Sequence, residues 1–222
     1  MKNTVRLFAL ALLLCVPMSQ HAAPAAAPQK ATNPLWQKLW DGNQAFQGNA
    51  ITFDGLKKLR GDLANGQKPP FLVLSCSDSR VPPELVFKQN LGDVFLVRSA
   101  GNVTDTLGIA SMEYAIAHDW TKLLVILAHE KCGAIEEAIK TTTPDTPNLA
   151  ALVWKIRESF VAPCTPNTDC WTLRTRQNAI YVVEDLKRRS AIIKRAIDGN
   201  KLPVVVAYYK LDGTLVVWKT IN

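Results

Sequence analysis

The stretch Cys76-Ser77-Asp78-Ser79-Arg80 decides how this chain is organised. It follows the apolar run Phe71-Leu72-Val73-Leu74, which is typical of a buried strand. Polar residues after such a strand lie at the carboxyl edge of a sheet, where open α/β folds place their sites. Cys76 and Asp78 are two residues apart, so their side chains can point the same way if the strand geometry continues. Arg80 adds a positive charge within reach of Asp78.

A second stretch of the same kind supplies further polar groups. The apolar run Leu123-Leu124-Val125-Ile126-Leu127 leads into His129-Glu130-Lys131-Cys132. Zinc binds thiolate, imidazole and carboxylate groups in tetrahedral geometry. Together the two stretches provide four such groups, namely Cys76, Asp78, His129 and Cys132. We predict that they form a metal site, because the alternative of ordinary buried core residues must hold for both cysteines and the histidine at once.

Composition restricts the class of protein. The chain has 222 residues, of which 48% are hydrophobic, and this excludes an intrinsically disordered chain. The formal net charge is +7, but the lysines and arginines are scattered along the sequence. Such a distribution favours a solvated basic surface over a nucleic-acid interface. No internal repeat and no boundary between two domains is visible, so we predict a single domain over residues 34–222.

The N-terminus has the three-part pattern of a secretory signal peptide. Lys2 and Arg6 precede an apolar core over residues 7–16, and small residues follow as far as Ala23. The apolar core is too short to span a bilayer as a helix. We predict a signal peptide over residues 1–23, a flexible leader over 24–33 and a periplasmic or otherwise exported protein. An uncleaved membrane anchor is the weaker alternative.

Export makes the remaining cysteines informative. Cys164 and Cys170 are six residues apart in a segment with proline and asparagine that is typical of a loop. In an oxidising compartment such a pair is expected to form a disulfide. Two free surface thiols are the alternative, which fits the cytosol better than an exported protein.

Alternating helix and strand patterns predict an α/β fold with a mostly parallel central sheet flanked by helices. The turn signal Asp212-Gly213 predicts an antiparallel hairpin at the C-terminal edge of this sheet. We predict strands over residues 71–74, 93–97, 123–128, 203–210 and 214–220. We predict helices over residues 34–46, 53–64, 106–118, 133–140, 149–160 and 171–197, and a further helix that starts at Pro82-Pro83.

The two polar stretches resemble the Cys-x-Asp-x-Arg and His-x-x-Cys motifs of the β-class carbonic anhydrases. The resemblance continues through Val81-Pro82-Pro83-Glu84, Gly92-Asp93-Val94-Phe95 and Arg98-Ser99-Ala100-Gly101-Asn102. It covers most of the chain from Pro34 onward. It implies an α/β fold, dimers or multiples of dimers, and zinc-dependent hydration of carbon dioxide to bicarbonate and a proton by zinc-bound hydroxide.

The resemblance also assigns roles to residues. Cys76, His129 and Cys132 resemble the three constant zinc ligands, and Asp78 and Arg80 resemble the catalytic pair. In the open form of the family the arginine holds the aspartate, and in the closed form the aspartate itself binds zinc.

The chain departs from the family at several positions, among them Lys88 and Asn90, which replace an acidic residue and a glycine common in related bacterial sequences. Ala128 stands where the family usually has glycine before its histidine. Some members carry a non-catalytic bicarbonate pocket of tryptophan, arginine and tyrosine. Arg98 and Tyr208 match that pocket, whereas Val73 stands where the tryptophan would be.

Two other functions remain open from the sequence. One is a non-catalytic zinc-binding protein of the same fold, in which Asp78 stays on the metal. The other is a related hydrolase of carbonyl sulfide or carbon disulfide. For the leading function we expect carbon dioxide and bicarbonate as substrates, a homodimer or higher homo-oligomer, no nucleic-acid partner, and no stable membrane span after signal cleavage.

Overall fold

A single five-stranded sheet organises the described part of the chain. The structure, a computed structural model, describes residues 33–50, 52, 55–161 and 163–221, so the predicted signal peptide and most of the leader lie outside it. The strands are arranged in the order β2-β1-β3-β4-β5. Their bounds are β1 (Phe71–Ser75), β2 (Val94–Arg98), β3 (Leu123–His129), β4 (Val204–Tyr209) and β5 (Leu215–Ile221).

The sheet is mostly parallel, as predicted. β1 lies between β2 and β3 and pairs parallel with both, and β4 pairs parallel with β3. β5 returns antiparallel to β4 and forms the C-terminal edge. Every residue of β1, β3 and β4 is buried. Strands covered on both faces need apolar side chains on both, which explains their nearly continuous hydrophobic runs.

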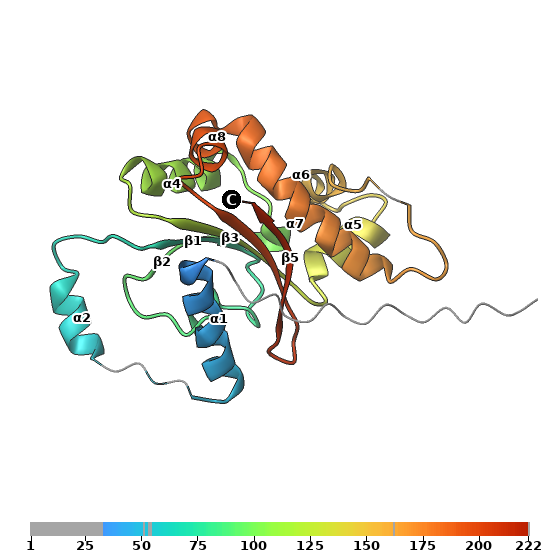
Figure 1. The fold of residues 1–222 in the computed structure, drawn as a ribbon. Coiled ribbons are helices and arrows are strands. Elements are labelled where there is room, and N and C mark those ends of the chain that lie inside the picture. The colour runs from blue at the N-terminus through green and yellow to red at the C-terminus, as the bar shows by residue number, and fades with distance from the viewer. Residues whose placement is uncertain (1–32, 51, 53–54, 162, 222) are drawn as a thin grey trace, which may run out of the picture.

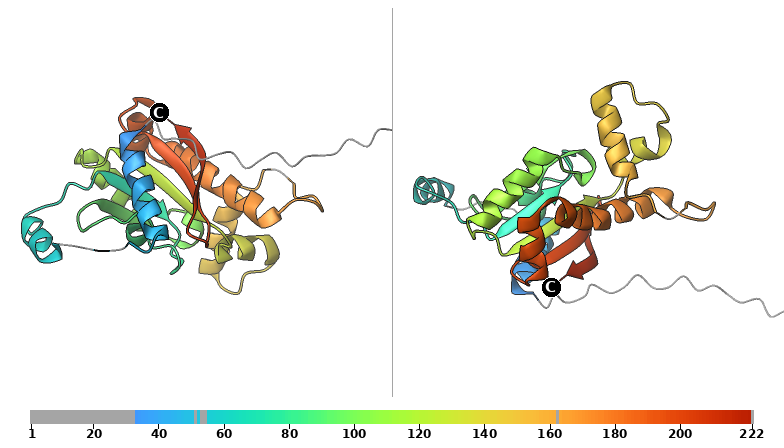
Figure 2. Two further views of the ribbon diagram at one scale, coloured as in Figure 1. Left: turned by 60° about the horizontal axis from the view of Figure 1, so that its bottom comes forward. Right: turned by 90° about the horizontal axis from the view of Figure 1, so that it is seen from above.

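Helices cover both faces of the sheet (Figure 1). One face packs against α4 (Thr106–Ala117), α7 (Cys170–Arg189) and α8 (Ala191–Asp198). The other packs against α1 (Pro34–Gln47) and α3 (Pro83–Val86). That layer continues into α5 (Gly133–Lys140) and α6 (Pro147–Arg157), which project from the sheet as a hairpin (Figure 2). All residues of α2 (Leu56–Asp62) are described, and none is buried. Within the described ranges no helix is both long and apolar enough to cross a membrane.

The predicted helix over residues 171–197 is in fact two helices. Ser190 separates α7 from α8 with an extended backbone conformation, φ −133° and ψ 113°. Its hydroxyl oxygen accepts a hydrogen bond from the Ile193 amide at 3.1 Å and donates to Glu113 Oε1 at 2.5 Å. A serine that caps a new helix in this way offers the backbone an alternative to continuing the old one.

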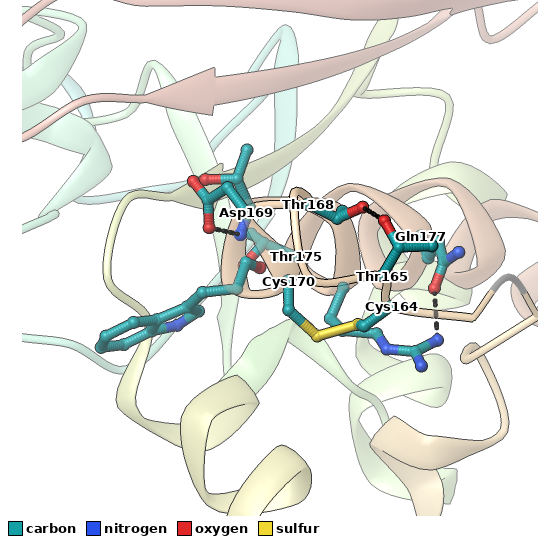
Figure 3. The surroundings of a disulfide bond; sticks show 10 residues. Cys164, Thr165, Thr168, Asp169, Cys170, Thr175 and Gln177 are labelled. Carbon is teal, nitrogen blue, oxygen red and sulfur yellow. Dashed lines mark hydrogen bonds between the residues drawn. A yellow bond between two sulfur atoms is a disulfide. The ribbon is translucent and has the colours of Figure 1, made fainter.

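The predicted disulfide is present at the beginning of α7 (Figure 3). Cys164 and Cys170 are bonded, with their Cα atoms 5.5 Å apart. Cys170 is the first residue of α7, so the bond attaches the preceding loop to the first turn of this helix. Cys76 and Cys132 are both free and buried.

A buried carboxylate joins α6 to α7. Asp185, whose side chain is 3% exposed, forms ion pairs with Lys155 at 2.9 Å, with Arg189 at 3.3 Å and with Arg188. Burial alone would raise the pKa of Asp185, but these three cations outweigh it and lower the pKa below its usual value. The ionised carboxylate therefore stabilises the folded state above the pKa of the unfolded chain, near 4.

We expect Asp185→Asn to lower the free energy of unfolding at pH 7 by about 3 kcal/mol, because it removes the buried carboxylate that three cations share. The difference from wild type should shrink as the pH falls through the lowered pKa of Asp185, where the wild-type carboxylate is protonated as well. Urea unfolding at pH 7 and pH 3 measures both effects. Asp198→Asn is the control, since Asp198 is ion-paired but 38% exposed and should matter much less. Equal losses for the two variants would contradict this expectation.

Candidate functional site

Three metal-binding side chains converge at the carboxyl edge of the sheet. Cys76 directly follows β1, His129 is the last residue of β3, and Cys132 is the N-cap of α5. β1 and β3 are neighbours, so the ends of these two strands lie side by side. The ligand atoms of all three residues lie within 4.8 Å of one another, and all three side chains are buried. The two sequence stretches therefore meet where the sequence predicted.

A tight turn brings His129 and Cys132 together. Lys131 in this turn has φ +52°, a left-handed conformation that reverses the chain between strand and helix. The turn is held from β4 and the hairpin, since Glu130 donates its amide to Tyr209 O at 2.8 Å and accepts from the Leu211 amide at 2.9 Å.

The loop after β2 supports the other side of the site. The Asn102 amide group donates to Leu127 O at 2.5 Å and to Leu74 O at 3.3 Å, which ties the ends of β3 and β1 together. The Gly101 amide points at the Cys76 sulfur from 3.4 Å. Gly101 has φ +68°, a left-handed conformation that favours glycine, and a Cβ there would lie 2.8 Å from Ile156 Cδ1.

The imidazole of His129 presents one nitrogen to the two cysteines. Its Nδ1 is 2.9 Å from Glu130 O, and a carbonyl only accepts, so Nδ1 carries the proton. Nε2 then has a free lone pair, is buried, and has no hydrogen-bond partner among the described residues. A buried polar atom without a partner costs free energy, and coordination to a metal ion would satisfy it.

The two cysteine sulfurs are spaced as ligands of one ion. They lie 3.8 Å apart, and two thiolates bound tetrahedrally to zinc at about 2.3 Å each would be separated by about 3.8 Å. The hydrogen bond from Cys132 lowers the pKa of Cys76 to about 4. The same hydrogen bond, together with burial, raises the pKa of Cys132. One thiolate is thus stable in the cluster alone, and a second needs a cation, so the donor set fits zinc.

Asp78 lies beside this cluster in a bidentate ion pair with Arg80. Arg80 Nε donates to Asp78 Oδ1 at 2.9 Å and Nη2 to Oδ2 at 2.7 Å, and the Arg80 amide also donates to Oδ1. These hydrogen bonds lower the pKa of Asp78 to about 2. Asp78 Oδ2 remains 3.9 Å from His129 Nε2. The carboxylate is therefore ionised and held by Arg80, and its role as a fourth metal ligand stays a prediction.

The match to the bicarbonate pocket implied that Arg98, Tyr208 and the position of Val73 line one pocket. The structure does not place them together. The Arg98 guanidinium donates to Cys76 O at 2.9 Å and to Asp78 O at 2.7 Å, so it holds the loop that carries both residues. Val73 packs in the layer of α1, whereas Tyr208 packs on the opposite face of the sheet.

The sequence did not reveal which side chains hold the backbone around the three candidate ligands. Besides Asn102, they are Trp171, which donates to Cys132 O, and Asn178, which donates to Gly101 O. Their partners are backbone carbonyls 39 and 77 residues away. No local spacing marks such contacts.

Known proteins are similar to this chain in sequence and in fold. The carbonic anhydrase family profile matches residues 71–216. Carbonic anhydrase 2 of Mycobacterium tuberculosis is 33% identical over 82% of this chain and 90% of its own length. The carbonic anhydrase of Mycolicibacterium smegmatis is 38% identical over 82% of this chain and 92% of its own.

Solved structures of similar fold include two β-carbonic anhydrases. The Coccomyxa β-carbonic anhydrase in complex with acetazolamide has a TM-score of 0.66 and 22% identity, over 86% of this chain and 88% of that one. A tetrameric β-carbonic anhydrase of Sordaria macrospora has a TM-score of 0.64 and 22% identity, over 86% of this chain and all of that one. These structures show the fold, and the profile and the sequence relatives show the family. The chain belongs to the family of β-class carbonic anhydrases.

Proposed function

We propose that this protein is a zinc-dependent carbonic anhydrase that interconverts carbon dioxide and bicarbonate. The observation that carries the proposal is the cluster of Cys76, His129 and Cys132, in which the two sulfurs lie 3.8 Å apart and His129 Nε2 has no hydrogen-bond partner among the described residues. The curated relatives named carbonic anhydrase support the same activity.

Each residue has a distinct role in this proposal. Cys76, His129 and Cys132 would hold the zinc ion, which would act as the Lewis acid that makes hydroxide available near neutral pH. Arg80 keeps Asp78 ionised and binds both of its carboxylate oxygens, which would keep Asp78 from binding the metal itself. Asp78 can accept a hydrogen bond from the attacking water and so orient its lone pair toward carbon dioxide.

We also propose that the protein is exported to the periplasm and that it forms a homo-oligomer. Export to the periplasm is supported by the signal-peptide pattern over residues 1–23 and by the Cys164–Cys170 disulfide. A homo-oligomer is supported by the Sordaria relative, which is described as tetrameric. It is also supported by exposed apolar side chains beside the edge strand β2, since on α4 Leu107 is 76% and Tyr114 is 51% exposed.

Stopped-flow hydration of carbon dioxide by the mature protein, combined with metal analysis, tests the proposed reaction. We expect one zinc per chain and turnover of carbon dioxide well above that of carbonyl sulfide or carbon disulfide. Zinc-loaded protein that turns over only the sulfur compounds would identify the related hydrolase. Zinc-loaded protein without any turnover would identify a non-catalytic zinc protein.

A further inference from the structure

The helix α7 contacts Cys132 directly and reaches Cys76 through Gly101. Trp171 Nε1 donates to the carbonyl of Cys132 at 2.9 Å. Two turns further along, Asn178 donates to Gly101 O at 2.6 Å, and the Gly101 amide points at the Cys76 sulfur. Residues seven apart lie on the same face of a helix, so one face of α7 supports both sulfurs.

The Trp171 contact restricts the backbone of a ligand residue. Cys132 is 1% exposed, and its carbonyl accepts both the Trp171 indole and the Glu136 amide, the latter at 3.1 Å. The indole ring is partly buried and packs against the core cluster that contains Cys132. Rotation of the Cys132 peptide group, which would move the sulfur, therefore requires the loss of this hydrogen bond.

The disulfide attaches the first turn of α7, which carries Trp171, to the preceding loop. Trp171 follows Cys170 directly, and Cys170 is bonded to Cys164 in the loop before the helix (Figure 3). Asp169 caps the same turn by accepting from the Thr172 amide at 3.1 Å. The other contacts of this end of α7 include the Asp169 cap, the Trp171 hydrogen bond and ring packing, and Arg174, which lies over the Phe160 ring at 4.4 Å.

We propose that Trp171 positions the metal ligand Cys132, and that the Cys164–Cys170 disulfide holds Trp171 in place to do so. The formation of the disulfide in the oxidising compartment would then raise the affinity of the site for its metal. This inference rests on the proposed zinc site and adds a residue and a bond that act on it from outside. Loss of a hydrogen bond that orients a metal ligand typically weakens metal binding about 10- to 100-fold.

Trp171→Phe in the mature protein tests the first half of the proposal. Phenylalanine keeps an aromatic ring and removes the N–H donor. We expect zinc to bind about 10-fold more weakly in competition with a chelator. We also expect the thiolate-to-cobalt absorption bands of the cobalt-loaded protein to shift, which a general loss of stability would not cause. Trp154→Phe is the matched control, because Trp154 is 55% exposed and stacks on Arg157. It should change neither quantity.

The double variant Cys164→Ser with Cys170→Ser tests the second half. It should weaken zinc binding in the wild-type background and cause no further loss when Trp171 is already phenylalanine, because the disulfide acts through Trp171. Additive losses in the triple variant would overturn the role of the disulfide. If Trp171→Phe does not fold, the zinc affinity of the double variant is compared with that of wild type. Equal affinities overturn the proposal.

Two further results separate this inference from the proposed function. Wild-type protein that binds zinc tightly, with Trp171→Phe indistinguishable from Trp154→Phe in affinity and cobalt spectrum, overturns the inference and leaves the proposed function intact. Wild-type protein that binds no zinc overturns both.

Discussion

Replacing His129 with alanine should remove the bound zinc and reduce carbon dioxide hydration by roughly 1,000-fold or more, because hydroxide at neutral pH depends on the metal. In the proposed site His129 supplies one of the three ligands, and two sulfurs alone would leave the ion without an imidazole ligand. Zinc content per chain and the initial hydration rate, measured on the same samples, check this expectation.

His118→Ala is the matched control for the loss of an imidazole. His118 is exposed at the end of α4 and contacts the ring of Tyr114 rather than the cluster. This variant should keep one zinc per chain and the wild-type rate. Retention of zinc and activity by His129→Ala would contradict the assigned ligand set.

Replacing Arg80 with alanine should lower turnover by about 100-fold while zinc content stays near one per chain, since Arg80 binds no metal itself but preorganises the charge next to it. Without its two hydrogen bonds the pKa of Asp78 should rise from about 2 toward its usual value, which still leaves the carboxylate ionised at pH 7. An unpaired carboxylate 3.9 Å from His129 Nε2 would then compete with water for the open metal position.

Arg80→Lys separates the effect of the positive charge from that of the two hydrogen bonds. Lysine keeps the positive charge and lacks the planar fork that binds both carboxylate oxygens, so its turnover should fall between wild type and Arg80→Ala. Hydration rates with zinc content measured for each variant provide the comparison. An Arg80→Ala variant as fast as wild type would exclude the role given to the ion pair.

The cluster of Cys76, His129 and Cys132 and the strands that carry it were predictable because their signals are local. Apolar runs mark β1 and β3, and each motif follows its strand within a few residues. Parallel strands place their carboxyl ends at one edge, so convergence of Cys76 with His129 needed only that the two strands be neighbours. The hairpin at Gly213 was predictable for the same reason.

Register and long-range contacts were not predictable in this way. Val73 pairs through β3 with Val205, and Tyr208 lies three residues beyond Val205. Side chains alternate along a strand, so an odd separation places Tyr208 on the other face of the sheet. Only the strand register shows that Val73 and Tyr208 lie on opposite faces, although the resemblance would place both positions in one pocket.

The break at Ser190 has a similar explanation. The apolar spacing on either side fits one continuous helix, and the serine hydroxyl finds a partner, Glu113, that lies on another helix. Local periodicity contains no information about that partner.

The central claim is that one zinc ion, held by Cys76, His129 and Cys132, makes this chain a carbonic anhydrase. Stepwise addition of zinc to metal-free mature protein, with the carbon dioxide hydration rate measured after each step, tests it most directly. The account predicts no catalysis before zinc is added and a linear rise to a plateau at one zinc per chain. Full activity in the metal-free protein, or a saturated site without activity, would contradict it.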